Sequence, residues 1–360
     1  MIDWDRLQNN LYSRNRTIRK SLDLCAQLYS KAVHRRLLKY YRSRNLRKRV
    51  PAKVISVGNI VAGGTGKTPM VRWLCKHFSD RGVSCAIVSR GYGRKRSKND
   101  VTILNKSAHS RSWLNVGDEP YMLCRQLPDT PVLVGKNRYK CALEAIRHFG
   151  SRIIVMDDGF QHLSLERDLD LVLLDCERPF DNGHLIPLGK LREPISHLVR
   201  ADVFILTRVP SARAEQNIRS FLNFVFPDIP VYGCFPRPVA VKQCLSEKRD
   251  PPEFLRNRDV LAFSGIGNPS SFAATLESCG ARVKKALNFP DHYSYSAKDV
   301  NNILKEAKRA GVEAIITTEK DEIRLPSKIE IVKQFYCLVI EVQFTDEAEF
   351  CEWLDGRIGI

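Results

Sequence analysis

The sequence predicts an α/β fold: a parallel sheet flanked by helices, with a smaller second α/β domain and a basic N-terminal helix. Two observations lead to this prediction. Short apolar segments rich in β-branched residues alternate with helical patterns, which is typical of a parallel sheet covered on both faces. In addition, a glycine-rich loop that ends in Lys67 and Thr68 separates the first expected strand from the first expected helix.

Each element is expected from its own pattern. Strands are predicted at 54–57, 84–89, 132–134, 153–156, 169–174 and 203–207, then at 260–264, 282–287, 314–318 and 338–342. Helices are predicted at 70–80, 120–127, 138–149, 269–279 and 298–310. Residues 92–100 are expected to form a basic loop.

The chain of 360 residues exceeds the usual size of one core, so we expect a large domain and a smaller one. Residues 51–225 are the expected nucleotide-binding domain. Six prolines between 226 and 252 predict a linker or hinge. Because a shorter α/β alternation follows them, 226–360 is expected to form the smaller C-terminal domain. A hinge there would let this domain close over the first one.

The N-terminal segment, 1–50, contains 14 Lys and Arg against three Asp, so +11 of the net charge of +18 lies there. Apolar residues recur in it at three- and four-residue steps: Leu22, Cys25, Tyr29, Val33, Leu37 and Tyr40 or Tyr41. This spacing predicts an amphipathic basic helix. Two interpretations compete: the helix packs on the body of the protein, or it lies on an anionic membrane surface.

The bulk composition narrows the class of protein. We find no apolar run near the roughly 20 residues that cross a bilayer and no signal peptide, so no transmembrane segment is expected. The 11 cysteines are scattered without a Cys-x-x-Cys pair, which favours free thiols in a reducing cytosol. The positive charge indicates a polyanionic partner, which leaves nucleic acid, an anionic membrane and a phosphorylated substrate as alternatives.

The glycine-rich loop has the chemistry of a P-loop, as in P-loop nucleoside triphosphatases. Its residues are Val61, Ala62, Gly63, Gly64, Thr65, Gly66, Lys67 and Thr68. Backbone N–H groups of such a loop surround the β-phosphate, the lysine neutralises β/γ oxygens and the hydroxyl holds Mg²⁺. The usual first glycine of the pattern is replaced by Val61, with a glycine upstream at Gly58. The loop therefore predicts ATP and Mg²⁺ as cofactors.

An acidic partner for the Mg²⁺ is expected at the end of another strand. Asp157 and Asp158 directly follow the apolar run 153–156. Ligands of open α/β sheets bind at this carboxyl edge, and Mg²⁺ prefers hard oxygen ligands. An Asp-Asp-Gly turn without a metal is the alternative. We take both aspartates as metal-associated and leave open which one binds directly.

Several motifs, in this order along the chain, closely resemble those of the tetraacyldisaccharide 4'-kinases, the lipid A 4'-kinases of Gram-negative envelope synthesis. They are 56–59, 63–69, 89–94, 117–120, 135–138, 157–162, 188–194, 289–293 and 317–321. The resemblance runs over most of the chain. It implies transfer of the ATP γ-phosphoryl group to the 4'-hydroxyl of an acylated glucosamine disaccharide 1-phosphate lipid, which gives lipid IVA. It also implies peripheral attachment to the cytoplasmic face of the inner membrane, whose anionic surface suits the basic helix.

The resemblance also suggests roles for residues that the sequence alone leaves ambiguous. Asp118 and Glu119 start a short helix, and without the resemblance we would favour helix capping for Asp118. The resemblance implies that Asp118 faces the 4'-hydroxyl and pairs with His292. A single His such as His292 is otherwise more often a surface or capping residue.

Three further charged residues are candidates for phosphate or metal. Arg138 and Arg192 are expected to stabilise phosphate charge, with a structural ion pair as the alternative for each. Glu193 is expected in the outer shell of the metal. For the basic loop, contact with phosphate or lipid headgroups and simple solvation are equally compatible with the sequence; its charges are Arg90, Arg94, Lys95, Arg96 and Lys98.

Two other functions remain as alternatives to the lipid kinase. One is a P-loop ATPase or nucleotide switch that acts on a protein partner, and the other is a nucleic-acid-binding ATPase. The second is disfavoured because the positive charge lies at one end and no helicase-like or RNA-binding signature appears. We therefore expect no nucleic-acid partner, and nothing in the sequence indicates an obligate protein partner.

Overall fold

The computed structural model describes residues 16–92, 94, 100–105, 112–246, 248–326 and 334–360. Its elements follow one another in the order α2 (Arg16–Arg42), η1 (Arg44–Leu46), β1 (Lys53–Gly58), α3 (Lys67–Asp80), β2 (Cys85–Ser89), β3 (Thr102–Leu104), α4 (Trp113–Val116), α5 (Asp118–Gln126), β4 (Val132–Val134), α6 (Arg138–Phe149), β5 (Ile153–Asp157), β6 (Leu169–Asp175), η3 (Ile195–Arg200), β7 (Val203–Thr207) and α7 (Ala212–Val225). The second part of the chain contains β8 (Val231–Gln243), β9 (Arg249–Asp250), η4 (Pro252–Leu255), β10 (Asp259–Ser264), α8 (Pro269–Ser278), β11 (Arg282–Asn288), α9 (Ala297–Ala310), β12 (Ala314–Thr318), α10 (Glu319–Glu322), β13 (Phe335–Phe344) and α11 (Glu347–Ile358).

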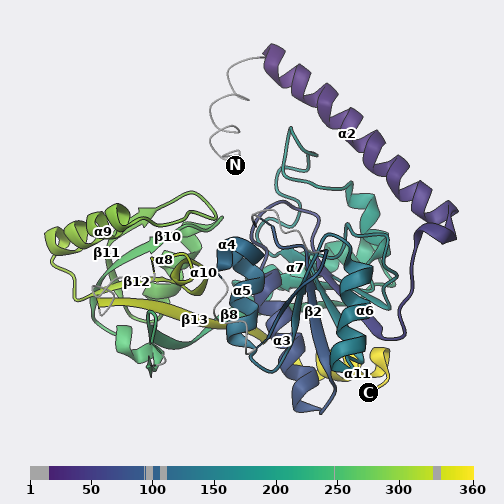
Figure 1. The fold of residues 1–360 in the computed structure, drawn as a ribbon. Coiled ribbons are helices and arrows are strands. Elements are labelled where there is room, and N and C mark those ends of the chain that lie inside the picture. Colours follow the sequence, from purple (N-terminus) through teal and green to yellow (C-terminus); the bar gives the residue numbers. More distant parts are fainter. Residues whose placement is uncertain (1–15, 93, 95–99, 106–111, 247, 327–333) are drawn as a thin grey trace.

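One continuous sheet runs through both lobes of the molecule, in the order β11-β10-β12-β13-β8-β7-β6-β1-β5-β2-β4-β3 (Figure 1). In the first lobe β1 lies centrally and pairs in parallel with β5 and β6. In the second lobe β10 pairs in parallel with β11 and β12. The predicted α/β class, a mostly parallel sheet flanked by helices, is confirmed.

Alternate residues of the central strands face two different cores, which explains why these strands are apolar throughout. Ile55 on β1 packs in the core that contains residues of α3, α5 and α11. Its neighbour Val54 points to the opposite face and packs with residues of α6. With helices on both faces, neither face of these strands is left for water.

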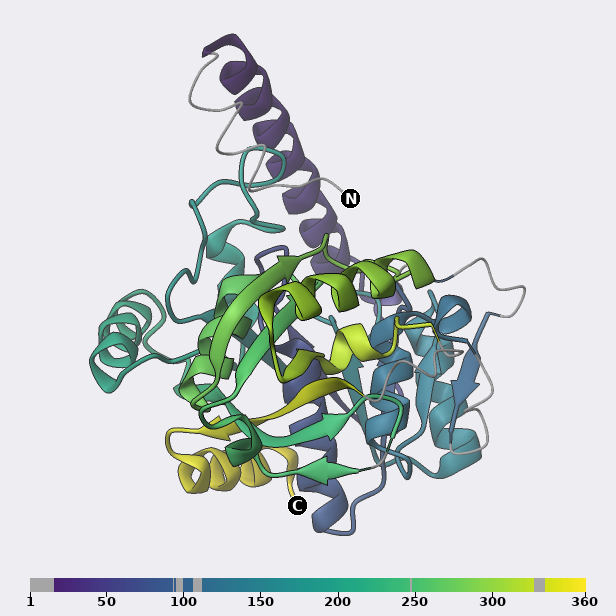
Figure 2. The ribbon, with the colours of Figure 1, turned by 90° about the vertical axis from the view of Figure 1, so that its left-hand side faces the viewer.

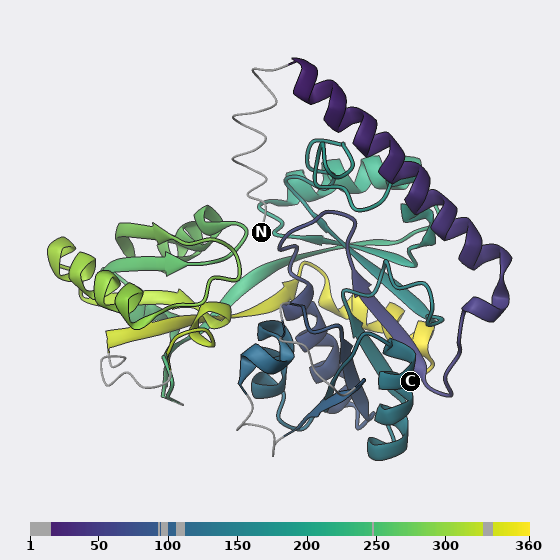
Figure 3. The ribbon, with the colours of Figure 1, turned by 45° about the horizontal axis from the view of Figure 1, so that its top comes forward.

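The lobes are joined by strands β8 and β13, which pair antiparallel from Cys234 opposite Phe344 to Gln243 opposite Tyr336 (Figure 3). The proline-rich segment, where the sequence predicted a linker, thus contains an extended strand. Pro236 and Pro238 fit into it opposite Val342 and Ile340, beside an irregularity in the register. Proline is tolerated at strand edges and bulges, so a run of prolines does not exclude a strand.

The chain crosses between the lobes twice, outward along β8 and back along β13. Helix α11 then packs beneath the first lobe, where Phe350, Leu354 and Ile358 join the core that surrounds Ile55 (Figure 1). The last residues of the expected C-terminal domain, 226–360, therefore make their contacts with the nucleotide-binding lobe. Helices α7 and α11 were not predicted from the sequence, and only 338–342 of β13 were predicted as strand.

Helix α2 extends along and beyond the first lobe (Figure 2). Most of the predicted apolar stripe faces the body: Leu22, Tyr29, Val33 and Leu37 are half-buried. The prediction was wrong for Cys25, which is exposed. Because successive residues of a helix are turned by about 100°, its neighbour Ala26 takes the buried position instead. The hydroxyl of Tyr29 donates to the carbonyl of Arg192 at 2.9 Å. The structure thus supports packing for this stripe. No helix in the described ranges combines the length and the apolar character needed to cross a membrane.

Candidate active site

The P-loop connects β1 to α3, as predicted. Gly66 has φ of +83° and lies at the N-terminal cap of α3, while Gly63 has φ of +125°, so both need the freedom of glycine. In the described part of the chain, no atom lies within 4 Å of a Cβ placed at Gly63 or Gly64, so the space beside them is open to a ligand. The backbone of Ala62 donates to the carbonyl of Lys190 at 2.8 Å and fastens the loop to the rest of the lobe.

The upstream glycine, Gly58, has a packing role. A Cβ at Gly58 would lie 2.5 Å from Cβ of Phe160, so only glycine lets β1 approach the segment that follows β5. Val61, at the position of the missing first glycine, forms an isolated antiparallel bridge with Leu191. Gly58 therefore does not replace the glycine that Val61 displaces.

Lys67 and Asp158 lie together at the base of the P-loop. Nζ of Lys67 is 3.6 Å from Oδ1 of Asp158 and donates to Oδ1 of Asn59 at 3.2 Å. Arg192 forms a bidentate pair with Asp158 at 2.7 and 3.0 Å. Burial favours protonation of Asp158, but Lys67 and Arg192 outweigh it and hold its pKa well below the usual range. Asp158 is therefore ionised, and the sequence-predicted residues Lys67, Asp158 and Arg192 are brought together.

Asn59 was missed as a functional candidate. Its amide donates to Oγ1 of Thr65 at 2.8 Å, and its carbonyl oxygen accepts from both Lys67 and Arg192. It thus orients the P-loop and its lysine. The signal that identified Asp157 and Asp158 was available here too, because Asn59 directly follows buried strand β1.

Asp157 lies at the end of β5 and is almost fully buried. Its Oδ2 accepts from Ser89 at 3.2 Å, while its Oδ1 has no hydrogen-bond partner among the described residues. Burial and the neighbouring carboxylates Glu119 and Asp158 raise the pKa of Asp157 to about 7. A buried carboxylate oxygen without a partner, beside a second carboxylate, fits the oxygen ligands that Mg²⁺ requires.

The two other expected metal residues are placed differently. Thr68 lies in the first turn of α3, half-buried, next to Lys67. Glu193 is buried and held by two side chains: its Oε2 is 2.9 Å from Nδ1 of His197 and 2.6 Å from Nη2 of Arg200. These partners outweigh burial and lower the pKa of Glu193. A position in the outer shell of the metal stays a prediction for Glu193.

Arg138 begins α6, whose N-cap is Asn137, and its guanidinium is buried. Its Nη2 donates to the carbonyl of Asp157 at 3.0 Å, and its Nε has no partner among the described residues. Of the basic loop, Lys95, Arg96 and Lys98 lie outside the described residues. Arg94 donates to the carbonyl of Val134 at 3.4 Å.

Asp118 and His292 come from different lobes and meet, as the resemblance implied. Nδ1 of His292 lies 2.7 Å from Oδ2 of Asp118, and Nε of Arg324 lies 3.0 Å from the same oxygen. Oδ1 of Asp118 accepts from the backbone of Glu119 at 2.9 Å, so the residue also serves the start of α5. His292 has φ of +60°, an uncommon backbone for a non-glycine residue, and its N–H is held by Asp291 at 2.9 Å.

The carboxyl ends of strands in both lobes face this site. A Cβ at Gly267, in the loop after β10, would lie 3.6 Å from the backbone nitrogen of Gly64 in the P-loop. His292 follows β11, and α10 follows β12. Asp321 and Arg324, which no prediction assigned a role, hold these loops together: Asp321 accepts from Gly265 at 3.0 Å, and Arg324 donates to the carbonyl of Gly265 at 3.3 Å.

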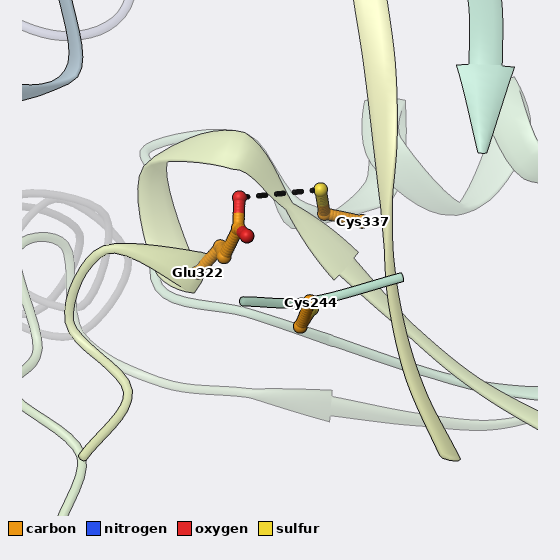
Figure 4. A group of neighbouring side chains, drawn as sticks. All are labelled: Cys244, Glu322 and Cys337. Atoms are coloured by element: carbon orange, nitrogen blue, oxygen red, sulfur yellow. Dashed lines mark hydrogen bonds between the residues drawn. The ribbon is translucent and has the colours of Figure 1, made fainter. Parts of the chain in front are cut away.

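A separate group of possible metal ligands lies in the second lobe, where Cys244, Glu322 and Cys337 come within 4.8 Å of one another (Figure 4). Glu322 is already paired there, with Nζ of Lys242 at 2.8 Å and the backbone of Leu245 at 2.9 Å. Hydrogen bonding to Cys244, together with burial, raises the pKa of Cys337 well above its usual value. Both carboxylate oxygens of Glu322 therefore already have partners, and the group needs no metal ion to balance its charge.

Comparison with known proteins assigns the chain to a family. The family model described as "Tetraacyldisaccharide-1-P 4'-kinase" matches residues 18–359. Among curated relatives, the tetraacyldisaccharide 4'-kinase of Syntrophobacter fumaroxidans is 39% identical over 87% of this chain and 82% of its own length. That of Halothermothrix orenii is 36% identical over 92% of this chain and 90% of its own. The crystal structure of Aquifex aeolicus LpxK in complex with ATP superposes with a TM-score of 0.73 at 30% identity, covering 95% of this chain and 99% of that one.

Proposed function

The chain belongs to the tetraacyldisaccharide 4'-kinase family, and from this premise we propose how its residues perform the reaction. It is an ATP-dependent kinase of lipid A biosynthesis that phosphorylates the 4'-hydroxyl of a tetraacyldisaccharide 1-phosphate. Family membership decides against the nucleotide switch and the nucleic-acid-binding ATPase. The residue roles, the metal and the membrane attachment are our proposals.

One observation supports the assignment of roles above all others: the P-loop and the Asp118–His292 pair lie at the same interface between the lobes. The P-loop belongs to the first lobe and His292 to the second, and Gly267 brings the second lobe to the P-loop itself. A donor nucleotide bound at the P-loop would therefore face an acceptor hydroxyl near His292. This is the positioning that phosphoryl transfer requires.

The donor half is supplied by the first lobe. The P-loop amides and Lys67 bind the β- and γ-phosphate oxygens. Arg138 adds positive charge through its Nε, which has no hydrogen-bond partner among the described residues. Mg²⁺ held by Thr68, Asp157 and Asp158 would neutralise charge on the same phosphate oxygens. Arg192 keeps Asp158 ionised and in place for this role.

The acceptor half is the carboxylate–imidazole pair. Asp118 orients His292 through the 2.7 Å contact, and the pair accepts the proton of the 4'-hydroxyl as the phosphoryl group arrives. A group that accepts this proton is what distinguishes a kinase site from one that only binds nucleotide. The substrate is an acylated disaccharide lipid, so the enzyme has to meet it at a membrane.

Helix α2 provides a surface for that encounter. Opposite the stripe that packs on the body, Leu24 and Leu28 are each 58% exposed and Leu38 is 36% exposed. The exposed residues around these leucines include Lys20, Lys31, Arg35 and Arg42. Exposed leucines among basic residues suit the interface of an anionic bilayer. We infer peripheral attachment to the cytoplasmic face of the inner membrane through this outward face.

A direct assay tests the proposed function. The full chain is incubated with γ-labelled ATP, Mg²⁺ and a detergent-dispersed tetraacyldisaccharide 1-phosphate. We expect label in the lipid, at the 4' position. Label that stays in ATP and free phosphate alone would overturn the kinase assignment for this chain. Omission of Mg²⁺ with added chelator tests the metal, and transfer at an undiminished rate would exclude it.

A further inference from the structure

The motif at 317–321 includes a lysine to which the proposed function gives no role. Lys320 lies on α10 in the second lobe, and its Nζ is 3.3 Å from each of three atoms: Oε1 of Glu119, Oδ1 of Asp291 and Nε2 of His292. Its side chain is only 20% exposed. Lys320 thus touches the imidazole whose other nitrogen is bound to Asp118.

The charge state of Lys320 follows from these neighbours. Burial lowers the pKa of a lysine, but Glu119, Asp291 and Asp118 together outweigh it and raise the pKa of Lys320 above its ordinary value. The group is therefore an ammonium ion at neutral pH. An ammonium has three N–H donors and no lone pair, so it can only donate to His292.

The two neighbours of His292 then determine where its proton lies. Nε2 faces Lys320 and must be the acceptor, so it is unprotonated. Nδ1 faces an ionised carboxylate at 2.7 Å, which can only accept, so Nδ1 carries the proton. Oδ2 of Asp291 is farther from Nε2, at 3.8 Å, and competes less well than Lys320 at 3.3 Å.

Asp118 itself is a poor proton acceptor in this arrangement. Burial alone would raise its pKa, but the hydrogen bond from His292 and the charges of Lys320 and Arg324 hold the pKa of Asp118 well below its usual range. Among the described residues, the ring of Tyr92 also lies near the imidazole, with 6.0 Å between the ring centroids. Nε2 of His292 is thus the one basic lone pair of the Asp118–His292 pair.

We propose that Lys320 is a positioning residue of the phosphoryl transfer, because it holds His292 as the neutral Nδ1–H tautomer and makes Nε2 the atom that accepts the hydroxyl proton. This inference rests on the proposed function. The 4'-oxygen forms its bond to the γ-phosphorus while the bond from that phosphorus to the β,γ-bridging oxygen breaks, and the electron pair leaves with ADP. The hydroxyl proton goes to Nε2, and Asp118 stabilises the imidazolium. When the 4'-hydroxyl donates to Nε2 in place of Lys320, the ammonium of Lys320 keeps its ion pairs with Glu119 and Asp291.

Nitrogen-15 spectroscopy of the full chain tests the tautomer directly. The protein has eight histidines, and labelling with ¹⁵N-histidine followed by comparison with His292→Gln assigns the two nitrogens of His292. We expect a protonated Nδ1 and an unprotonated Nε2 in the wild type at neutral pH. In Lys320→Met, which removes the donor and the charge, Nε2 should become at least partly protonated. Lys320→Arg should keep the wild-type pattern.

Lys76→Met is the matched control, because Lys76 pairs with Glu341 at the surface and does not touch His292. It should leave both nitrogen shifts unchanged. A protonated Nε2 in the wild type would overturn the proposal. Identical nitrogen shifts in the wild type and Lys320→Met would overturn it too, and would leave Lys320 only its ion pair with Glu119 between the lobes.

Kinetics provide the second readout. We expect kcat of Lys320→Met to fall about tenfold to a hundredfold, which is part of the 10²–10⁴ that acid–base catalysis contributes, with little change in KM for ATP. If Lys320→Met does not fold, two measurements still test the proposal: the tautomer of His292 in the wild type, and the activity of Lys320→Arg, which should stay close to that of the wild type. Failure of the lipid assay with the wild type would remove the proposed function, whereas the nitrogen shifts would report on the tautomer independently.

Discussion

The imidazole of His292 and the carboxylate of Asp118 lie 2.7 Å apart although 174 positions separate them in the chain. Asp118 opens α5 in the first lobe and His292 follows β11 in the second. Their contact depends on the way that the long β8–β13 ladder places one lobe against the other (Figure 3). The acceptor side of the site therefore exists only when the two lobes are together.

Replacing Asp118 by Asn should lower kcat by about 10²–10⁴, because the amide neither orients His292 in the same tautomer nor stabilises the imidazolium. Steady-state kinetics with the disaccharide lipid measure this. Asp346→Asn is the control, since Asp346 caps a different helix, α11, by accepting from the backbone of Glu349. If Asp118 served only as a helix-start residue, the two variants would show similar, small effects.

Lys67→Met should abolish most of the transfer while the fold is kept, because the ammonium neutralises the β/γ-phosphate oxygens of the donor. Its loss also leaves Asp158 with one cation fewer, although Arg192 remains. Turnover and ATP binding by calorimetry measure the effect. Lys76→Met lies on the same helix, α3, and points to Glu341 instead, so it should retain wild-type turnover. Equal turnover in both variants would argue against a P-loop role for Lys67.

The sequence predicted the P-loop lobe in detail because each signal there is local. Strand β1, the glycine loop and α3 follow one another, and the aspartates after β5 are marked by the apolar run before them. The predicted boundaries of β5 and α6 agree closely with the structure. Local patterns could not predict which distant segments meet, and the contact between Asp118 and His292 was expected from the family resemblance alone. The proximity of Gly267 to Gly64 depends on the twist and register of a sheet shared by both lobes.

The same limit explains the residues that were missed. Lys320 and Arg324 follow a short apolar strand and resemble ordinary surface charges in the sequence. Their importance comes from burial against the first lobe: the Arg324 side chain is fully buried beside Asp118. The proline-rich segment does connect the lobes, but it does so as strand β8, because pairing with β13 gives an extended conformation to a composition that is typical of linkers.

An ion pair between the lobes should contribute measurably to stability. Arg72 on α3 lies 3.4 Å from Glu319 on α10, and it also donates to the carbonyl of Ile340, while Glu319 accepts from Gln126 at 2.7 Å. Both charged side chains are largely buried. Arg72→Met should therefore cost about 3–5 kcal/mol in the free energy of unfolding, because it leaves Glu319 short of its counter-charge.

Urea unfolding of Arg72→Met, Glu319→Gln and the double variant measures the coupling between the two residues. The exposed pair Lys76–Glu341 is the control, and Lys76→Met should cost at most about 1 kcal/mol. Additive effects of the two single changes would show that the pair does not couple the lobes.

The outward face of α2 should bind anionic vesicles. Replacing Leu24, Leu28 and Leu38 by Ser removes exposed apolar surface and should weaken binding to phosphatidylglycerol vesicles by at least about tenfold, since each buried leucine is worth about 1.5–3 kcal/mol. Binding of the wild type should also fall as salt rises. Vesicle sedimentation measures both effects. Leu114→Ser, on α4, is the control for loss of an exposed leucine and should bind vesicles like the wild type. Equal vesicle binding by the triple variant and the wild type would show that this face of α2 is not the membrane-binding surface.

Protonation of His162 should destabilise the fold at acidic pH. The ring accepts or donates a hydrogen bond with Ser164 at 2.9 Å, and burial together with Arg138 and Arg167 lowers its pKa from 6.5 to about 3. Above pH 6.5 the residue is neutral in both the folded and unfolded states and has no effect. As pH falls below 6.5 only the unfolded state gains the proton, so stability is lost progressively until the folded pKa is reached. At about 1.36 kcal/mol per pH unit, the loss at pH 5 is about 2 kcal/mol.

His162→Gln keeps a hydrogen-bonding group that does not titrate. Its free energy of unfolding should therefore fall about 2 kcal/mol less than that of the wild type between about pH 7.5 and pH 5, as measured by urea unfolding at both values; parallel losses in the two proteins would show that His162 is not the group responsible.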